Sequence, residues 1–68
     1  MIPGRVISFD EQTGYGYVKL LDDPAYLDYK ELWFCWMDVE GSVKRGDAVK
    51  VLLSDKLGVT TVERLEKV

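Results

Sequence analysis

The fold is decided by a stretch in which the residue types alternate, Gly14-Tyr15-Gly16-Tyr17-Val18-Lys19-Leu20. In an extended strand, one face of this stretch carries the two tyrosines and the lysine, and the other carries small and aliphatic side chains. The glycines on either side of Tyr15 let the backbone bend sharply and let large neighbouring groups lie close to it. Two orientations are open at this point. Either the rings of Tyr15 and Tyr17 stand outside, where a planar group can stack on them, or they lie in the core with their hydroxyls reaching solvent.

The length and composition of the chain allow one small domain, residues 1–68. Apolar residues make up 47% of the chain, which is enough for a compact core and argues against disorder. A single cysteine excludes an internal disulfide and fits a reducing cytoplasm, which is the compartment we expect. The chain contains no signal-like start and no long apolar run, so we expect neither secretion nor a membrane partner.

The residue types present leave little room for catalysis. The chain has no histidine and one cysteine, which are too few nitrogen and sulfur ligands for a structural zinc site. A histidine-dependent triad cannot be built, and no motif places a base beside any of the serines. The paired carboxylates of Asp22 and Asp23 stand in a turn-like context that implies no cleft. We therefore expect neither an enzyme nor a bound cofactor or metal.

Short apolar and β-branched runs separated by turn residues predict five strands along the chain. We expect these strands over residues 5–9, 15–20, 31–37, 48–53 and 59–65. The first two should pair as an antiparallel hairpin, and a glycine-containing loop should join the last two. Asp23 and Pro24 are typical of a turn or a helix start, so residues 24–30 should form either a loop or one short helical turn. Five short strands at this spacing predict an all-β fold, a small antiparallel barrel that is closed or nearly closed.

The second informative stretch is Leu32-Trp33-Phe34-Cys35-Trp36. Burying Leu32 and Phe34 on one face of a strand puts Trp33 outside on the other. A bend at the end of the strand would free Trp36 from this alternation and bring it to the surface that carries Trp33. Large exposed rings usually mark a contact surface. Cys35 is either a small apolar filler or a redox-sensitive thiol whose oxidation switches binding.

Several of these residues fit the pattern of a known family. The chain resembles the cold-shock domain at Gly4-Arg5-Val6, Phe9 and Gly14-Tyr15-Gly16-Tyr17-Val18. The corresponding residues of the family are Gly-Lys-Val, Phe and Gly-Phe-Gly-Phe-Ile. The family's second motif, Val-Phe-Val-His-Phe, is similar to residues 32–36, and its fourth-strand opening is similar to residues 46–49. The resemblance implies a five-stranded oligonucleotide-binding (OB) fold whose aromatic strands bind single-stranded DNA or RNA, as an RNA chaperone or regulator.

The resemblance also implies which side chains make contact. Four rings match family positions that carry stacking aromatics, and Arg5 matches a basic position and keeps its charge. Lys19 adds a second cation on the face that carries the tyrosines. The candidate nucleic-acid-binding residues are therefore Tyr15, Tyr17, Trp33, Trp36, Arg5, Lys19 and Phe9.

The chain departs from the family pattern at positions that bear on affinity. Ile7 and Ser8 stand where lysine and tryptophan are usual, and Thr13 and Cys35 replace a lysine and the histidine. The net charge of −3 is also unfavourable for contacts to phosphate. Stacking needs no net charge and is worth about 1–3 kcal/mol per base. We therefore expect weaker binding than in a typical family member, with a shallow dependence on salt.

A second hypothesis assigns the same aromatic face to a protein. Tyrosine, tryptophan and phenylalanine are enriched in the cores of protein interfaces. An acidic surface that has lost cations also suits a protein partner better than it suits phosphate. In this alternative the rings dock a partner protein or form the seam of a homodimer.

Overall fold

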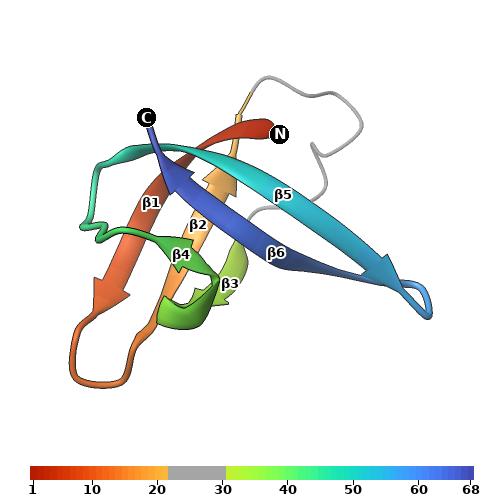
Figure 1. Cartoon of the computed structure of the whole chain (residues 1–68), viewed down its shortest axis with the longest axis horizontal. Coiled ribbons are helices and arrows are strands. Elements are labelled where there is room, and N and C mark those ends of the chain that lie inside the picture. The colour runs from red at the N-terminus through yellow and green to blue at the C-terminus, as the bar shows by residue number, and fades with distance from the viewer. Residues whose placement is uncertain (22–30) are drawn as a thin grey trace.

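The computed structural model describes residues 1–21 and 31–68, and most of them lie in strands. The elements are β1 (Ile2–Asp10), β2 (Tyr15–Leu20), β3 (Leu32–Cys35), the single-turn 3-10 helix η2 (Trp36–Asp38), β4 (Val39–Glu40), β5 (Ala48–Lys56) and β6 (Val59–Lys67). The strands form one sheet in the order β3-β2-β1-β5-β6-β4. This sheet curls into a nearly closed barrel (Figure 1), which is a small all-β, OB-like fold as predicted.

Each of the five predicted strands is present, and the differences lie at their ends. β1, β5 and β6 extend beyond the predicted ranges, whereas β3 ends at Cys35 because the chain turns into η2 there. The sixth strand, β4, was not predicted, since two residues are too few to show a period of alternation. β4 also pairs with β6 in parallel, whereas the neighbouring pairs among the other strands are antiparallel. The helical turn or loop predicted for residues 24–30 lies outside the described residues.

The turn between β1 and β2 is built from short-range hydrogen bonds. The Asp10 carboxylate accepts a hydrogen bond from the Gln12 N–H (2.8 Å), and the Asp10 carbonyl accepts one from the Gly14 N–H (2.8 Å). Gly14 has a φ of 78°, which glycine adopts without strain. A bulge after Val6 shifts the register of β1, so that Ser8 rather than Ile7 pairs with Tyr17.

The barrel interior is filled by the inward-facing residues of five strands, β1, β2, β3, β5 and β6. The largest fully buried side chains are Phe34, Leu65, Val6, Val18, Val49 and Val51. Val18 and Leu20 are buried while their neighbours in β2 are exposed, so the predicted alternation of this strand is confirmed. The ring of Phe9 is partly buried and stacks on that of Phe34, with 5.9 Å between ring centroids and 2° between planes.

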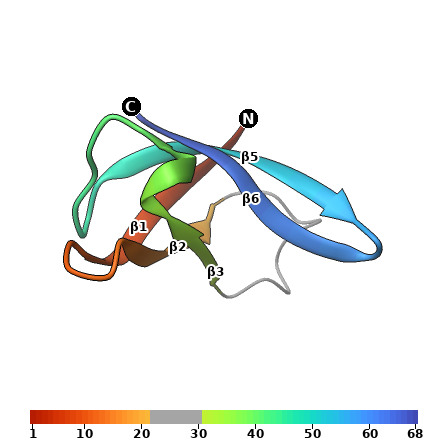
Figure 2. The same cartoon turned by 60° about the horizontal axis from the view of Figure 1, so that its bottom comes forward.

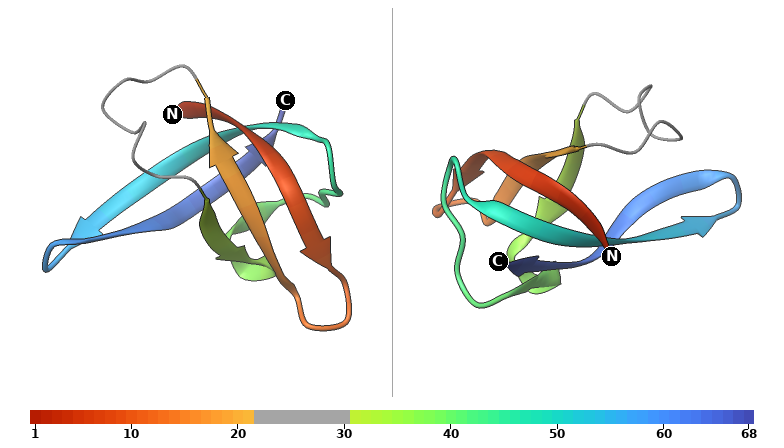
Figure 3. Two further views of the ribbon diagram at one scale, coloured as in Figure 1. Left: turned by 180° about the vertical axis from the view of Figure 1, so that it is seen from behind. Right: turned by 90° about the horizontal axis from the view of Figure 1, so that it is seen from above.

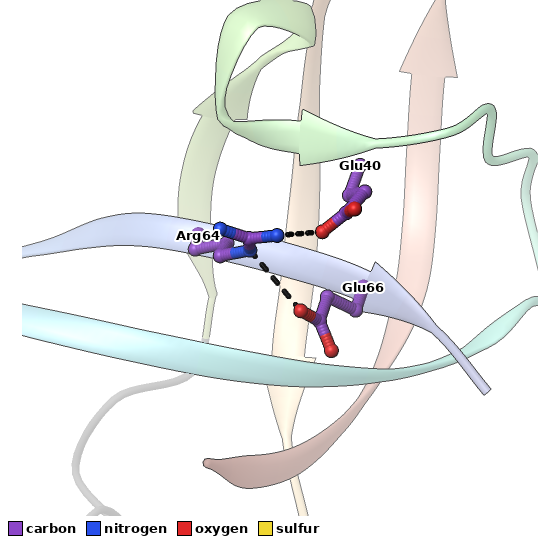
Figure 4. A network of polar contacts seen from close by, with 3 residues as sticks. All are labelled: Glu40, Arg64 and Glu66. Atoms are coloured by element: carbon purple, nitrogen blue, oxygen red, sulfur yellow. Dashed lines mark hydrogen bonds and ion pairs between the residues drawn. The ribbon is translucent and has the colours of Figure 1, made fainter.

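Contacts between chain segments far apart in sequence bring the two edges of the sheet together. The Trp36 N–H donates to the Gly14 carbonyl (2.7 Å), which ties η2 to the β1–β2 turn. From there η2 carries the chain from β3 toward β6 (Figure 2). Arg64 on β6 forms ion pairs with Glu40 on β4 and with Glu66 on its own strand (Figure 4). These contacts, with the pairing of β4 and β6, hold η2 and β4 against the rest of the barrel.

The β5–β6 hairpin extends beyond the rest of the barrel (Figures 1 and 3). β1 pairs with β5 only as far as Val51, whereas the pairing of β5 with β6 continues to the hairpin tip. The tip residue Leu57 is fully exposed and has a φ of 54°. Among residues 1–21 and 31–68, no helix has the length and apolar character needed to cross a membrane.

Candidate functional site

The aromatic face, defined as Tyr15, Tyr17 and Trp33, lies on the outer surface of β2 and β3. The exposed fractions of these residues are 54%, 47% and 58%, so all three rings stand in water. Tyr17 pairs directly with Trp33 across the two strands. Tyr15 lies diagonally from Trp33, and their rings meet edge to face with centroids 5.7 Å apart. The outward orientation, which the sequence left open, is therefore the one that the chain adopts.

The rings are positioned by a glycine between them that faces the core. A Cβ atom at Gly16 would lie 2.3 Å from the Ser8 carbonyl oxygen and 2.9 Å from the Phe34 ring. Only glycine fits there, so β1 and the core can pack tightly behind the strand. On the outer side, Tyr15, Tyr17 and Trp33 border a shallow depression of about 320 Å³. A flat group such as a nucleobase can lie in it against an aromatic surface.

The charges beside the aromatic face are arranged along the strands. Arg5 and Lys19 are opposite each other in the β1–β2 pairing, two residues beyond Tyr17 along β2. The Arg5 guanidinium donates to the Gly46 carbonyl (2.8 Å), which fixes its position at the surface. Asp10 pairs with Tyr15 at the opposite end of the face. Two cations therefore lie at one end of the rings and one carboxylate at the other.

Trp36 leaves the strand alternation as predicted, but it borders a different cavity. The residue is 63% exposed and begins η2. Its indole lies against Gly14, where an added Cβ would come within 2.4 Å of the indole Cδ1. The cavity beside it, of about 400 Å³, is also lined by Phe9 and by the segment 41–43. The structure thus separates Trp36 and Phe9 from the depression bordered by the aromatic face.

One wall of this second cavity is formed by residues 41–43, which lie in a mostly polar connection between strands. Val43 is buried in the core, although the residues on both sides of it are exposed. Gly41 has a φ of 88°, which redirects the chain after β4. One apolar residue between polar ones was the only signal in the sequence, and it is too weak to predict a cavity wall.

Cys35 lies beside the aromatic face, opposite Tyr15 in the β2–β3 pairing. Its thiol donates to an Asp38 carboxylate oxygen (3.3 Å), and its backbone N–H donates to the same oxygen (3.3 Å). The partial burial of Cys35 and these hydrogen bonds fit the interpretation of this residue as a packing residue. The described residues hold no cluster of three histidine, cysteine, aspartate or glutamate side chains that could bind a metal ion.

The fold and this face together define a small OB-like barrel that displays aromatic side chains on adjacent strands. No protein-family model matches the chain, and none of the curated proteins compared with it is significantly similar. The resemblance to the cold-shock domain therefore stays a prediction, based on the residues quoted for it above.

Proposed function

We propose that the chain binds single-stranded nucleic acid by stacking bases on the aromatic face. The observation that carries this proposal is the exposure of three large rings, Tyr15, Tyr17 and Trp33, on neighbouring strands. Aromatic platforms of this kind bind bases with little sequence preference, because every base has a π-face. Stacking contributes about 1–3 kcal/mol per base, so three rings supply useful affinity even when phosphate contacts are few.

The charges set the expected path of the phosphate backbone. Arg5 and Lys19 lie at one end of the face, and Asp10 at the other repels phosphate. The backbone of a bound strand would therefore run past the two cations and diverge from the face at the Asp10 end. Two phosphate contacts on a single strand correspond to a slope of about −1.4 in log affinity against log salt concentration. This shallow slope is the behaviour expected of a binder that relies on stacking.

Trp36 and Phe9 extend this proposal to a neighbouring subsite. Their cavity is separate from the depression between the tyrosines and Trp33, so it would take another base rather than share the same one. Weak and sequence-tolerant binding of this kind suits an RNA chaperone or a regulator of RNA or DNA, which is the role that we propose.

The test is a titration with DNA and RNA oligonucleotides of about eight nucleotides, within the site size of an OB fold. The variant Trp36→Phe leaves Trp33 as the single tryptophan, so its fluorescence reports on the aromatic face. We expect quenching of Trp33 on binding. Tyr17→Leu should weaken binding about fivefold or more, because it removes one stacking surface, and Tyr17→Phe is the matched control that keeps the ring.

Two results would overturn the proposal. One is the lack of any quenching at low salt. The other is sedimentation that shows a dimer at the concentrations used, together with a Trp33 that solvent quenchers no longer reach. That second result would support the alternative in which the aromatic face is the seam of a homodimer.

A further inference from the structure

A second exposed groove lies on the other side of the barrel, between the segment η2–β4 and the outer surface of β5 and β6. Figure 1 views the molecule from this side. The left view of Figure 3 shows the opposite side, on which β1, β2 and β3 lie. We call it the acidic groove and define it by Met37, Glu40, Leu52, Glu63 and Arg64. It has a volume of about 410 Å³ and does not include any residue of the aromatic face.

The apolar part of the groove comes from two side chains that the core does not use. Met37 is 73% exposed and Leu52 is 40% exposed. Methionine is flexible and polarizable, so it adapts to the shape of an incoming side chain. The two residues give the groove an apolar surface on which an aliphatic side chain can bury itself.

A bulge in β6 brings charges to the edge of this apolar surface. Leu52 pairs with Arg64, but the next residue of β5, Leu53, pairs with Val62. Glu63 is therefore the extra residue, and both Glu63 and Arg64 are exposed. Bulges commonly redirect side chains in this way.

The charge of the groove is negative once the ion pairs are considered. Arg64 is engaged by Glu40 and Glu66, so its guanidinium is already neutralised (Figure 4). Glu63 has no ion-pair partner among residues 1–21 and 31–68. Asp38 also lines the groove, and its carboxylate accepts two hydrogen bonds from Cys35. Such a surface repels phosphate and attracts ammonium or guanidinium groups.

We propose that the acidic groove docks a basic segment of a partner protein. An aliphatic side chain of that segment packs on Met37 and Leu52, and a lysine or arginine beside it pairs with Glu63. The occupant follows from charge complementarity, because an apolar surface and the unpaired carboxylate of Glu63 occur together here. This function is independent of nucleic-acid binding, since it uses a different side of the barrel. Together the two surfaces would let the chain hold a basic protein and a nucleic acid at once.

The test uses the full chain labelled with ¹⁵N and a synthetic peptide in which lysine and leucine alternate. We expect backbone amide shifts at Met37, Leu52 and Glu63, with the signals of Tyr17 and Trp33 unchanged. Glu63→Lys should weaken the peptide about fivefold, because an attractive contact becomes repulsive. Asp55→Lys makes the same change of charge near the hairpin tip and should have a much smaller effect. Leu52→Ser tests the apolar contact, and because Leu52 is exposed the variant should fold.

Several outcomes would overturn the proposal. A control peptide with serine in place of leucine should bind more weakly, and equal binding would mean that charge alone is responsible. Equal weakening by Glu63→Lys and Asp55→Lys would mean that no specific site exists. Peptide shifts centred on Tyr17 and Trp33 would assign the peptide to the aromatic face. Shifts in the groove on adding an oligonucleotide would assign the groove to nucleic acid instead.

Discussion

The barrel exposes apolar side chains on two sides, and the charges around them differ in sign. Beside the aromatic face, Arg5 and Lys19 outnumber Asp10. In the acidic groove, carboxylates outnumber Arg64, which is itself engaged by two glutamates. The free energy of an apolar contact does not depend on the sign of the partner's charge, so the surrounding charges decide which partner fits. The net charge of −3 therefore agrees in sign with the acidic groove but not with the aromatic face, so it does not predict the partner of each surface.

The two surfaces also differ in what supports them. The aromatic face is backed by the core, because the residue between its tyrosines packs against β1 and Phe34. The acidic groove is bordered by a two-residue strand that Arg64 ties to β6 by an exposed ion pair. Changes behind the aromatic face should therefore affect the whole fold, whereas changes at the groove should stay local.

The largest effect is expected from Gly16→Ala. The added Cβ would lie 2.3 Å from the Ser8 carbonyl oxygen, so β1 and β2 must separate. We expect a loss of about 3 kcal/mol in the free energy of unfolding, at the upper end for overpacking. Urea denaturation followed by circular dichroism measures it.

Gly41→Ala is the matched control for this prediction. A Cβ at Gly41 would meet no neighbour within 4 Å, but the residue has a φ of 88°. Its replacement should cost about 1–2 kcal/mol through backbone strain alone. Equal losses of stability in the two variants would mean that the close approach of the Ser8 carbonyl oxygen is not the reason why position 16 requires glycine.

The members of the aromatic face could be predicted from the sequence, because alternation along β2 puts Tyr15 and Tyr17 on one face of the strand. The sequence leaves open whether that face is outside, and the burial of Val18 and of Phe34 decides it for the two tyrosines and for Trp33. The acidic groove could not be predicted in this way. It depends on a register shift between Leu52 and Leu53 and on the parallel pairing of β4 with β6, and neither leaves a periodic pattern in the sequence.

The second prediction separates the two surfaces by function. Trp33→Ala should weaken oligonucleotide binding by about fivefold to 150-fold, because one stacking surface is worth about 1–3 kcal/mol. The same variant should leave binding of the basic peptide unchanged, and Leu52→Ser should show the reverse pattern. Fluorescence anisotropy with a labelled oligonucleotide and a labelled peptide measures both affinities. If either variant weakened both ligands equally, the two surfaces would not be independent.

The third prediction concerns the ion pairs that hold β4. Arg64→Met should lower the free energy of unfolding by about 1 kcal/mol at low salt, because exposed pairs contribute little individually. The difference should shrink at high salt, where exposed charges are screened. The variant also releases Glu40, so binding of the basic peptide should become stronger.

Thermal unfolding at two salt concentrations measures the stability. The control is Arg45→Met, which removes an exposed arginine that has no ion-pair partner in the described residues. Equal losses in both variants would contradict the prediction.

The smallest effect is expected at Asp47, in the turn that precedes β5. The Val6 N–H donates to the Asp47 carbonyl (3.0 Å), which connects β1 to the residue that precedes β5. The Asp47 carboxylate accepts a hydrogen bond from the Lys44 N–H (2.9 Å) and pairs with Lys67 (3.5 Å). The hydrogen bond from Lys44, followed by the nearby charge of Lys67, holds the pKa of Asp47 below its ordinary value of 3.8. Both contacts favour the charged carboxylate.

The lowered pKa sets the direction of the pH dependence. Because the folded pKa is the lower one, the stabilisation is fully present above pH 3.8 and is lost as the pH falls through the folded value. Asp47→Asn has no carboxyl group to protonate, so its stability should fall less than that of the original chain below this pH. Urea denaturation across the acid range measures the difference between the two. If the two curves were parallel through the acid range, protonation of Asp47 would not contribute, and the link between β1 and β5 would depend on the backbone hydrogen bonds alone.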